Sequence, residues 1–333
     1  MSQTITRKAV FQSRLPPMTR TSVILDVDTG IDDAFALLFA ARHPKINLLG
    51  VTCVDGNTNV DQVIVNTLKV LDAAGAGEIP VARGAVRPLL GQSHYAEYVH
   101  GADGMGDLGL PNSTRAIDSR TAVELIRDLV EASPEPVTLV PLAPLTNIAL
   151  FLRAFPETAK KVKRIVLMGG SASAGNATPA AEFNVWHDPE AAAIVFQSGV
   201  PILMYGLDVF MRPGITADEA KTLEASADPC AQFAGALITA FVARIGSPVT
   251  LGDYGAVASV IAPELITTEF FDVVVDTSAG PARGQTIVDR RPPLELEIEP
   301  LRLESGAHVE VTLDLDVEGI RNLWLTTIDQ HWK

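Results

Sequence analysis

Four aspartates lie within eight residues near the start of the chain, in the stretch VILDVDTGIDDAFALL at 23–38. They are Asp26, Asp28, Asp32 and Asp33. Carboxylates this close repel one another unless a positive charge lies among them. A run of like charge usually marks a solvent-facing surface, and that interpretation needs no ligand. The apolar residues on both sides favour a different one, a turn between a strand and a helix that holds a metal ion or a cationic ligand.

The elements around this turn follow from the apolar pattern. Val23, Ile24 and Leu25 are typical of a buried strand, and Leu37 and Leu38 continue a helical spacing after the aspartates. Further apolar runs predict buried strands, and amphipathic spacing predicts helices between them. The predicted strands are 46–54, 135–142, 162–170 and 200–208, and the predicted helices are 61–75 and 188–199. Strands alternating with helices favour an α/β fold with an open, mostly parallel sheet flanked by helices.

The last third of the chain has a different pattern. A long helix is predicted near 229–245, followed by alternating strand patterns such as 308–316, so the sheet is expected to be mixed. No linker divides this part off, and we expect a single domain over 22–333. The stretch 1–21 is basic at several positions and lacks a long apolar segment, so we expect a flexible N-terminal tail.

Composition excludes several classes of partner. With 333 residues, 47% of them hydrophobic and 20% charged, the chain has the composition of a globular protein with a large core. Its net charge of −14 disfavours binding to nucleic acid or to anionic membrane surfaces, and no run approaches the length of a membrane span. Cys53 and Cys230 are too few for a disulfide framework, which favours a reducing, cytoplasmic location with both thiols buried.

Polar residues follow several of the predicted strands. Ligands of parallel sheets gather outside the carboxyl ends of the strands. Asn57 follows the second strand, PLAPLTN follows the next long one, and Asn176, Glu182 and Asn184 follow the strand after that. Each residue alone is an ordinary turn residue. Together with the aspartates they predict an oxygen-rich pocket for a hard cation and a polyhydroxylated ligand.

Two known aspartate motifs fit this stretch poorly. An EF-hand loop has glycine at its sixth position and glutamate at its twelfth, whereas counting from Asp26 places Gly30 fifth and Leu37 twelfth. A phosphatase of the haloacid-dehalogenase type also begins with a strand and Asp-x-Asp. That motif leaves Asp32 and Asp33 unexplained, so it stays a distant alternative.

The motif DVDTGIDDA instead resembles the Asp-x-Asp-x-Gly-x-Asp-Asp signature of the inosine-uridine-preferring nucleoside hydrolase family. The resemblance continues in order through GVTCVDGN, HGADGMG, LVPLAPLTNIA, VLMGG, GNATPAAEFNVWHDPEAA and RGQTIVD, over about residues 22–330. It implies a single Rossmann-like α/β domain, Ca²⁺ at the strand ends and a homodimer or homotetramer. It also implies hydrolysis of ribonucleosides to ribose and free base.

The resemblance also implies roles for individual residues. The implied metal ligands are Asp28, Asp33, the backbone carbonyl of Leu142, and Asp253. The implied contacts to the nucleoside are Asp32, Asn57, Met168, Asn176, Glu182 and Asn184, with His100 either contacting the base or only shaping a lid loop. Base specificity is expected from the loops near 92–106 and 240–254.

The chemistry requires an activated water and a stabilised sugar cation, because ribosyl C–N cleavage passes through an oxocarbenium-like transition state. Ca²⁺ is a weak acid, so Asp28 is the candidate general base that takes a proton from a metal-bound water.

The sequence accounts less well for how the nucleobase leaves. Well-known relatives carry a histidine that protonates the base, but Gly252 stands in its place. Tyr254, His100, His94 and Tyr95 are candidate substitutes, or the base leaves with little proton help. His187 is interpreted as a helix-entry residue. A divergent or non-catalytic member of the family that binds nucleosides or ribose is the alternative function, favoured by the missing histidine and opposed by the presence of Asp28.

Overall fold

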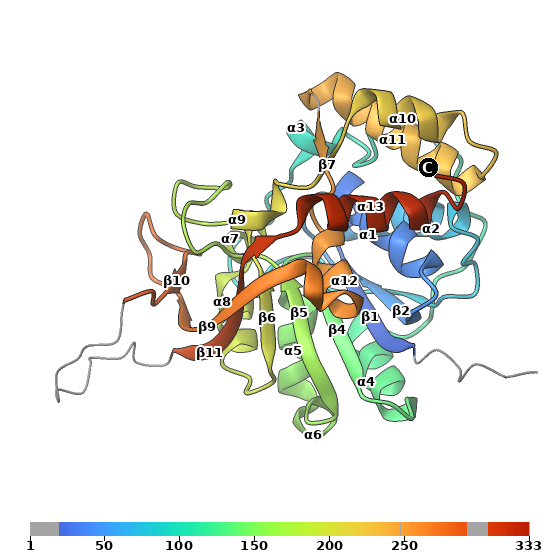
Figure 1. Cartoon of the computed structure of the whole chain (residues 1–333). Coiled ribbons are helices and arrows are strands. Elements are labelled where there is room, and N and C mark those ends of the chain that lie inside the picture. The colour runs from blue at the N-terminus through green and yellow to red at the C-terminus, as the bar shows by residue number, and fades with distance from the viewer. Residues whose placement is uncertain (1–19, 247, 292–305, 333) are drawn as a thin grey trace, which may run out of the picture.

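The computed structural model describes residues 20–246, 248–291 and 306–332. Its centre is a nine-stranded sheet covered by helices on both faces (Figure 1). From edge to edge the strands are β10 (Thr286–Val288), β9 (Ile266–Val275), β11 (Ala307–Leu315), β6 (Ile202–Tyr205), β5 (Val162–Met168), β4 (Val137–Pro141), β1 (Thr21–Val27), β2 (Ile46–Cys53) and β3 (Val81–Arg83). The predicted tail at 1–21 lies almost wholly outside the described residues, and Thr21 already begins β1.

Strand directions confirm the predicted mostly parallel, mixed sheet. All neighbours from β3 to β11 pair in parallel, whereas β9 pairs antiparallel with both β11 and β10. The predicted strands at 46–54, 135–142, 162–170 and 200–208 correspond to β2, β4, β5 and β6, each shorter at one end or both. Strand 308–316 corresponds to β11.

Helices fill the connections between the strands. They are α1 (Ile31–Arg42), α2 (Val60–Ala73), α3 (Glu97–His100), α4 (Ala122–Ala132), α5 (Thr146–Ala154), α6 (Pro156–Ala159), α7 (Phe183–His187), α8 (Pro189–Phe196), α9 (Leu207–Phe210), α10 (Ala217–Glu224), α11 (Pro229–Ile245), α12 (Tyr254–Ile261) and α13 (Val317–Ile328). A short pair of strands, β7 (Gly214–Ile215) and β8 (Val249–Thr250), lies outside the main sheet. The predicted helix at 229–245 is α11. No helix in the described part of the chain is long and apolar enough to cross a membrane.

Alternating residues of β1 show how the core is divided. Val23 and Leu25 belong to one buried cluster and Ile24 to the other, because successive side chains of a strand point to opposite faces. The first cluster is shared with α1, α2, α11, α12 and α13, and the second with α4, α5 and α8. The helices α10 and α11 extend past one end of the sheet, where α3 also lies (Figure 1).

Asp26 does not lie in the turn where we predicted it. It is inside β1 and 1% exposed, and its carboxylate accepts hydrogen bonds from Thr52 Oγ1 at 2.5 Å and Asn147 Nδ2 at 2.7 Å. Burial raises its pKa to about 7. A carboxylate in a strand interior interrupts the apolar pattern, so the pattern predicts the end of the strand before Asp26. Asp26 therefore ties β1 to its neighbours and takes no part in the acidic cluster.

Candidate active site

A pocket of about 310 Å³ lies at the carboxyl ends of β1, β2, β4 and β5. Every predicted site residue except Asp33 lines it. They are Asp28, Asp32, Asn57, His100, Leu142, Met168, Asn176, Glu182, Asn184 and Asp253. The structure thus brings together residues more than 200 positions apart in the chain. Their individual roles stay predictions, since shared lining shows proximity alone.

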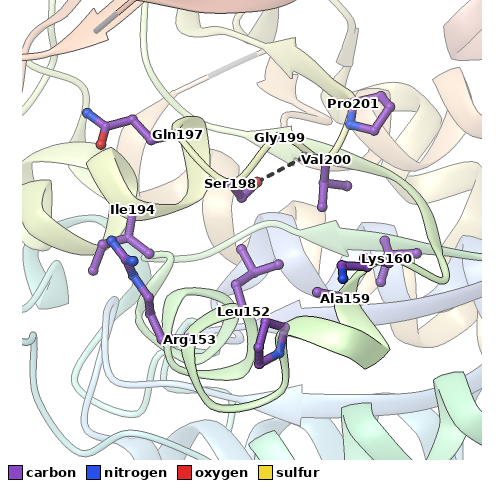
Figure 2. Close-up of a pocket in the computed structure, with 12 residues that line it drawn as sticks. Leu152, Arg153, Ala159, Lys160, Ile194, Gln197, Ser198, Gly199, Val200 and Pro201 are labelled. Carbon is purple, nitrogen blue, oxygen red and sulfur yellow. Dashed lines mark hydrogen bonds between the residues drawn. The ribbon is translucent and has the colours of Figure 1, made fainter.

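A larger hollow lies elsewhere on the molecule and has the opposite character. It measures about 640 Å³ and lies where β5 begins, at the amino end of the strands. Figure 2 shows Arg153, Lys160, Gln197 and Ser198 among its lining residues. No carboxylate lines it, so it offers a cation no charged ligand. The pocket at the carboxyl ends is therefore the candidate active site.

The floor of the candidate site is a buried group of carboxylates. Asp28, Asp33 and Asp253 are 1%, 0% and 3% exposed, and one carboxylate oxygen each of Asp32, Asp33 and Asp253 lies within 4.8 Å of the others. Burial is the largest cause that raises the pKa of Asp28, Asp33 and Asp253 well above the usual range. Charge repulsion adds to it, chiefly from Asp33 for Asp28 and from Asp32 for the other two.

Local backbone geometry fixes these carboxylates in place. Asp28 directly follows β1, and Asp33 lies in the first turn of α1, where its Oδ2 accepts from Gly30 N at 3.0 Å. The Asp28 Oδ2 accepts from Asn57 N at 2.7 Å. A Cβ on Gly56 would lie 2.1 Å from that same oxygen, so only glycine allows the close approach. The DGN sequence after β2 is thus shaped to hold Asp28.

The opposite wall comes from the segment after β5. Glu182 Oε2 accepts from the backbone N–H of Gly170 and Val185, and its Oε1 accepts from that of Asn184. Burial raises the Glu182 pKa to about 7 although these hydrogen bonds lower it. The Asn184 Nδ2 donates to the Leu142 carbonyl oxygen at 2.9 Å. This contact places the Leu142 carbonyl, a predicted metal ligand, beside the sugar-binding candidates.

His100 lies on α3 at the edge of the carboxylate group. Its Nδ1 accepts from Ile31 N at 3.3 Å and lies 3.9 Å from Asp32 Oδ1. Burial lowers its pKa. A ring nitrogen that accepts a hydrogen bond carries no proton, so this imidazole is neutral and protonated at Nε2. His100 thus keeps one donor, and it lines the pocket as predicted.

Three of the four candidate acids are elsewhere. The Tyr254 hydroxyl is buried and donates to the Ile320 carbonyl at 2.9 Å, so Tyr254, one of the four candidates for the role of the missing histidine, points away from the pocket. Tyr95 donates to Asp55, and the His94 ring packs 4.6 Å from the Trp186 ring. None of the three lines the pocket.

The packing around Gly252 leaves no room for a side chain in place of the histidine. A Cβ built there would lie 2.4 Å from Phe210 Cζ, and the backbone φ is +46°. The Phe210 ring therefore fills the volume that a side chain at position 252 would need. It belongs to an apolar wall that includes Met211, Phe241 and Ile245.

Not every residue of this apolar wall was predicted from the sequence. The loops near 92–106 and 240–254, expected to set base specificity, do supply lining residues such as Tyr98 and Phe241. Phe210 and Met211 lie just after β6 and were not predicted. Their position after the carboxyl end of a parallel strand was the available signal.

The carboxylate group fits a divalent metal ion. In the part of the chain that the structure describes, no lysine or arginine forms an ion pair with Asp28, Asp33 or Asp253. Carboxylate and carbonyl oxygens are the ligands of hard cations such as Ca²⁺. A cation among them would offset the repulsion that raises their pKa values.

Comparisons with known proteins point the same way. Residues 23–322 match the sequence model of a family described as "Inosine-uridine preferring nucleoside hydrolase". The pyrimidine-specific ribonucleoside hydrolase RihA of Shewanella baltica is 43% identical over 281 residues, which are 82% of this chain and 87% of that protein. A plant nucleoside hydrolase structure, the PpNRh1 enzyme, is similar with a TM-score of 0.86 and 30% identity, over 94% of this chain and 99% of that one. The structure of the purine-preferring ribonucleoside hydrolase from Gardnerella vaginalis is similar with a TM-score of 0.84 and 32% identity, over 92% of this chain and 98% of that one.

Proposed function

Since the chain belongs to the inosine-uridine preferring nucleoside hydrolase family, we propose that it hydrolyses the N-glycosidic bond of ribonucleosides with Ca²⁺ bound at the carboxylate group and Asp28 as general base. Ribonucleoside hydrolase activity is what the family and the relatives have in common, and the chain is an N-glycosidic hydrolase. One observation supports the proposed metal site and general base. Asp28, Asp253 and Leu142 line the same pocket, and a carboxylate oxygen of Asp33 lies within 4.8 Å of one of Asp253.

Asp28, Asp33, Asp253 and the Leu142 carbonyl are the groups that would hold the ion. When bound, Ca²⁺ would neutralise the crowded carboxylates and help orient a water molecule and the ribose hydroxyls. Asp32 belongs to the same close group of oxygens, although we predicted it as a ligand of the sugar. Asp32 is partly exposed whereas Asp33 is buried, and this favours Asp32 as the residue that binds the sugar, because a residue that binds ribose hydroxyls must be accessible from the pocket.

Asp28 is suited to take a proton from the attacking water. One of its oxygens, Oδ2, is held by the Asn57 peptide N–H, so the carboxylate is fixed in orientation and Oδ1 is left to act as base. The positive charge that develops on the sugar would be stabilised by Asp32 and Glu182. Met168 would lie beneath the sugar, and Asn176 and Asn184 would hold its hydroxyls.

Release of the base must proceed without an imidazole at position 252. Phe210 occupies that volume, and the surrounding wall is apolar, so we infer that the base leaves with little proton help from this side. His100, through its Nε2–H, is the remaining candidate donor. We further infer a preference for uridine and cytidine, because relatives at 40–43% identity are named pyrimidine-specific.

The experiment is ribose release from inosine, adenosine, guanosine, uridine and cytidine by purified protein, before and after treatment with a strong Ca²⁺ chelator. We expect release that is fastest from the pyrimidine nucleosides, is lost with the chelator and returns with added Ca²⁺. Release unaffected by chelation would refute the metal proposal. Nucleoside binding without release from any substrate would favour the non-catalytic alternative. A homodimer or homotetramer and a cytoplasmic location stay predictions.

A further inference from the structure

A buried carboxylate and imidazole face each other on segments that also supply lining residues of the pocket, and the proposed mechanism uses neither. Asp55 and His187 have side-chain exposures of 1% and 0%, and Asp55 Oδ2 lies 3.4 Å from His187 Nε2. Neither of these two atoms, nor His187 Nδ1, has a hydrogen-bond partner in the structure. The other Asp55 oxygen, Oδ1, accepts from the Tyr95 hydroxyl at 3.2 Å. Asp55 is therefore the centre of a Tyr95–Asp55–His187 group.

The three residues come from three separate segments that build the pocket. Asp55 follows β2 and lies two residues before Asn57, which lines the pocket. Tyr95 directly precedes the turn into α3, the helix that carries His100. His187 is the last residue of α7, the helix whose first turn contains Asn184. The carboxylate of Asp55 thus joins the α3 wall of the pocket to its α7 wall.

Neighbouring contacts reinforce the same connection. The Ala96 N–H donates to the Asn57 carbonyl at 2.9 Å, and the His94 ring packs against Trp186 on α7. These contacts fix the residues on either side of Tyr95 in the segment before α3. Three apolar side chains would fill the same space at lower cost, because a buried carboxylate requires compensating partners. A polar group at this buried position favours a role in fixing geometry.

We propose that Asp55, held between His187 and Tyr95, is a positioning residue that fixes the α3 wall against the α7 wall so that the pocket is preformed for the nucleoside. The inference rests on the proposed function, since the nucleoside is the ligand whose contacts lie on both walls. Asp55, His187 and Tyr95 act through Asn57, Asn184 and His100 and do not touch the substrate. Loosening this group should weaken substrate binding more than it slows the chemical step.

Tyr95→Phe is the mildest test, because it removes one hydroxyl from a residue that is 41% exposed. We expect KM for the best nucleoside to rise about three- to tenfold, the size of one lost hydrogen bond, with kcat within about twofold. Amide hydrogen exchange over 96–101 should accelerate in the same variant. A KM and an exchange rate equal to those of the unaltered protein would overturn the proposal.

Two substitutions of His187 separate its polar contact with Asp55 from space filling. His187→Gln keeps an N–H donor that reaches toward Asp55, whereas His187→Leu keeps volume and removes the donor. We expect the leucine variant to raise KM and the glutamine variant to restore most of the loss. Equal KM values in the two variants would mean that His187 only fills space. If His187→Leu does not fold, the Tyr95→Phe result still decides.

A matched control is available on the far part of the sheet. His308 Nδ1 lies 3.4 Å from Asp272 Oδ1, the same separation as in the buried pair, but His308 is exposed and lies on β11, away from the pocket. His308→Gln should leave both KM and kcat unchanged. An unaltered protein that releases no ribose would count against the proposed function, whereas an active protein with unaffected Tyr95→Phe and His187→Leu variants would count against this inference alone.

Discussion

Gly252→Ala tests whether Phe210 truly fills the position of the missing histidine. The added Cβ would lie 2.4 Å from Phe210 Cζ and 2.6 Å from its Cε2. Carbon atoms in contact normally lie about 3.5–4.0 Å apart, so the ring must move by roughly 1 Å or more. Phe210 is only 9% exposed, which leaves it little room to do so.

The expected loss of stability combines two effects. Overpacking of a filled site costs about 1–3 kcal/mol. The φ of +46° adds about 1–2 kcal/mol for a residue that has a Cβ. We therefore expect Gly252→Ala to lower the free energy of unfolding by about 3 kcal/mol.

A double-mutant cycle with Phe210→Ala isolates the contact. In the Phe210→Ala background only the backbone cost remains, so the two substitutions should be less destabilising together than their separate effects predict, by about 1–3 kcal/mol. Urea unfolding of the four proteins measures this coupling. Additivity within about 0.5 kcal/mol would show that Phe210 does not occupy the space. Ribose release by Phe210→Ala should show a higher KM, because the apolar wall loses an aromatic ring.

Three further predictions concern the acidic groups and the excluded acid. Asp28→Asn should abolish turnover and leave the fold intact; near-normal ribose release would remove Asp28 from the mechanism. Tyr254→Phe should keep kcat while losing about 1 kcal/mol of stability from its bond to Ile320, and a large fall in kcat would return Tyr254 to the list of acids. Burial raises the pKa of Asp26 and Glu182 to about 7, so their favourable contribution is present below their unfolded pKa near 4 and is lost as the pH rises through about 7. Chelator-treated protein should therefore melt at a higher temperature at pH 6 than at pH 8, because the pKa of about 7 lies between these two pH values. A lower melting temperature at pH 6 would contradict this expectation.

The strands and the strand-end residues were predictable because local patterns determine them. The strands predicted from the sequence are largely apolar runs, and parallel strands bring their carboxyl ends to one edge whatever the order of the sheet. This is why Asn57 and Glu182, far apart in sequence, could be assigned to one pocket. Asp26 was misplaced for the same reason, since a local pattern cannot show that Thr52 and Asn147 would solvate a carboxylate inside a strand.

Contacts made through tertiary packing were beyond local patterns. Tyr254 stands next to Asp253 in sequence, yet the start of α12 points its hydroxyl toward Ile320 and away from the pocket. His187 was interpreted as a helix-entry residue, but it ends α7 and faces Asp55, more than 100 residues earlier in the chain. Side-chain direction decides both cases, and it depends on how the helices pack.

The aspartate crowding has a consequence for how activity depends on the metal. Without a cation, burial and mutual repulsion raise the pKa of Asp28 well above the usual range, and a protonated carboxyl cannot accept a proton from water. A positive charge beside Asp33 and Asp253 would lower the Asp28 pKa and return it to the carboxylate form. In the proposed mechanism, the same electrostatics would make Asp28 competent as general base only when an ion is bound. We therefore expect substitution of any of these three aspartates to impair ion binding and catalysis together.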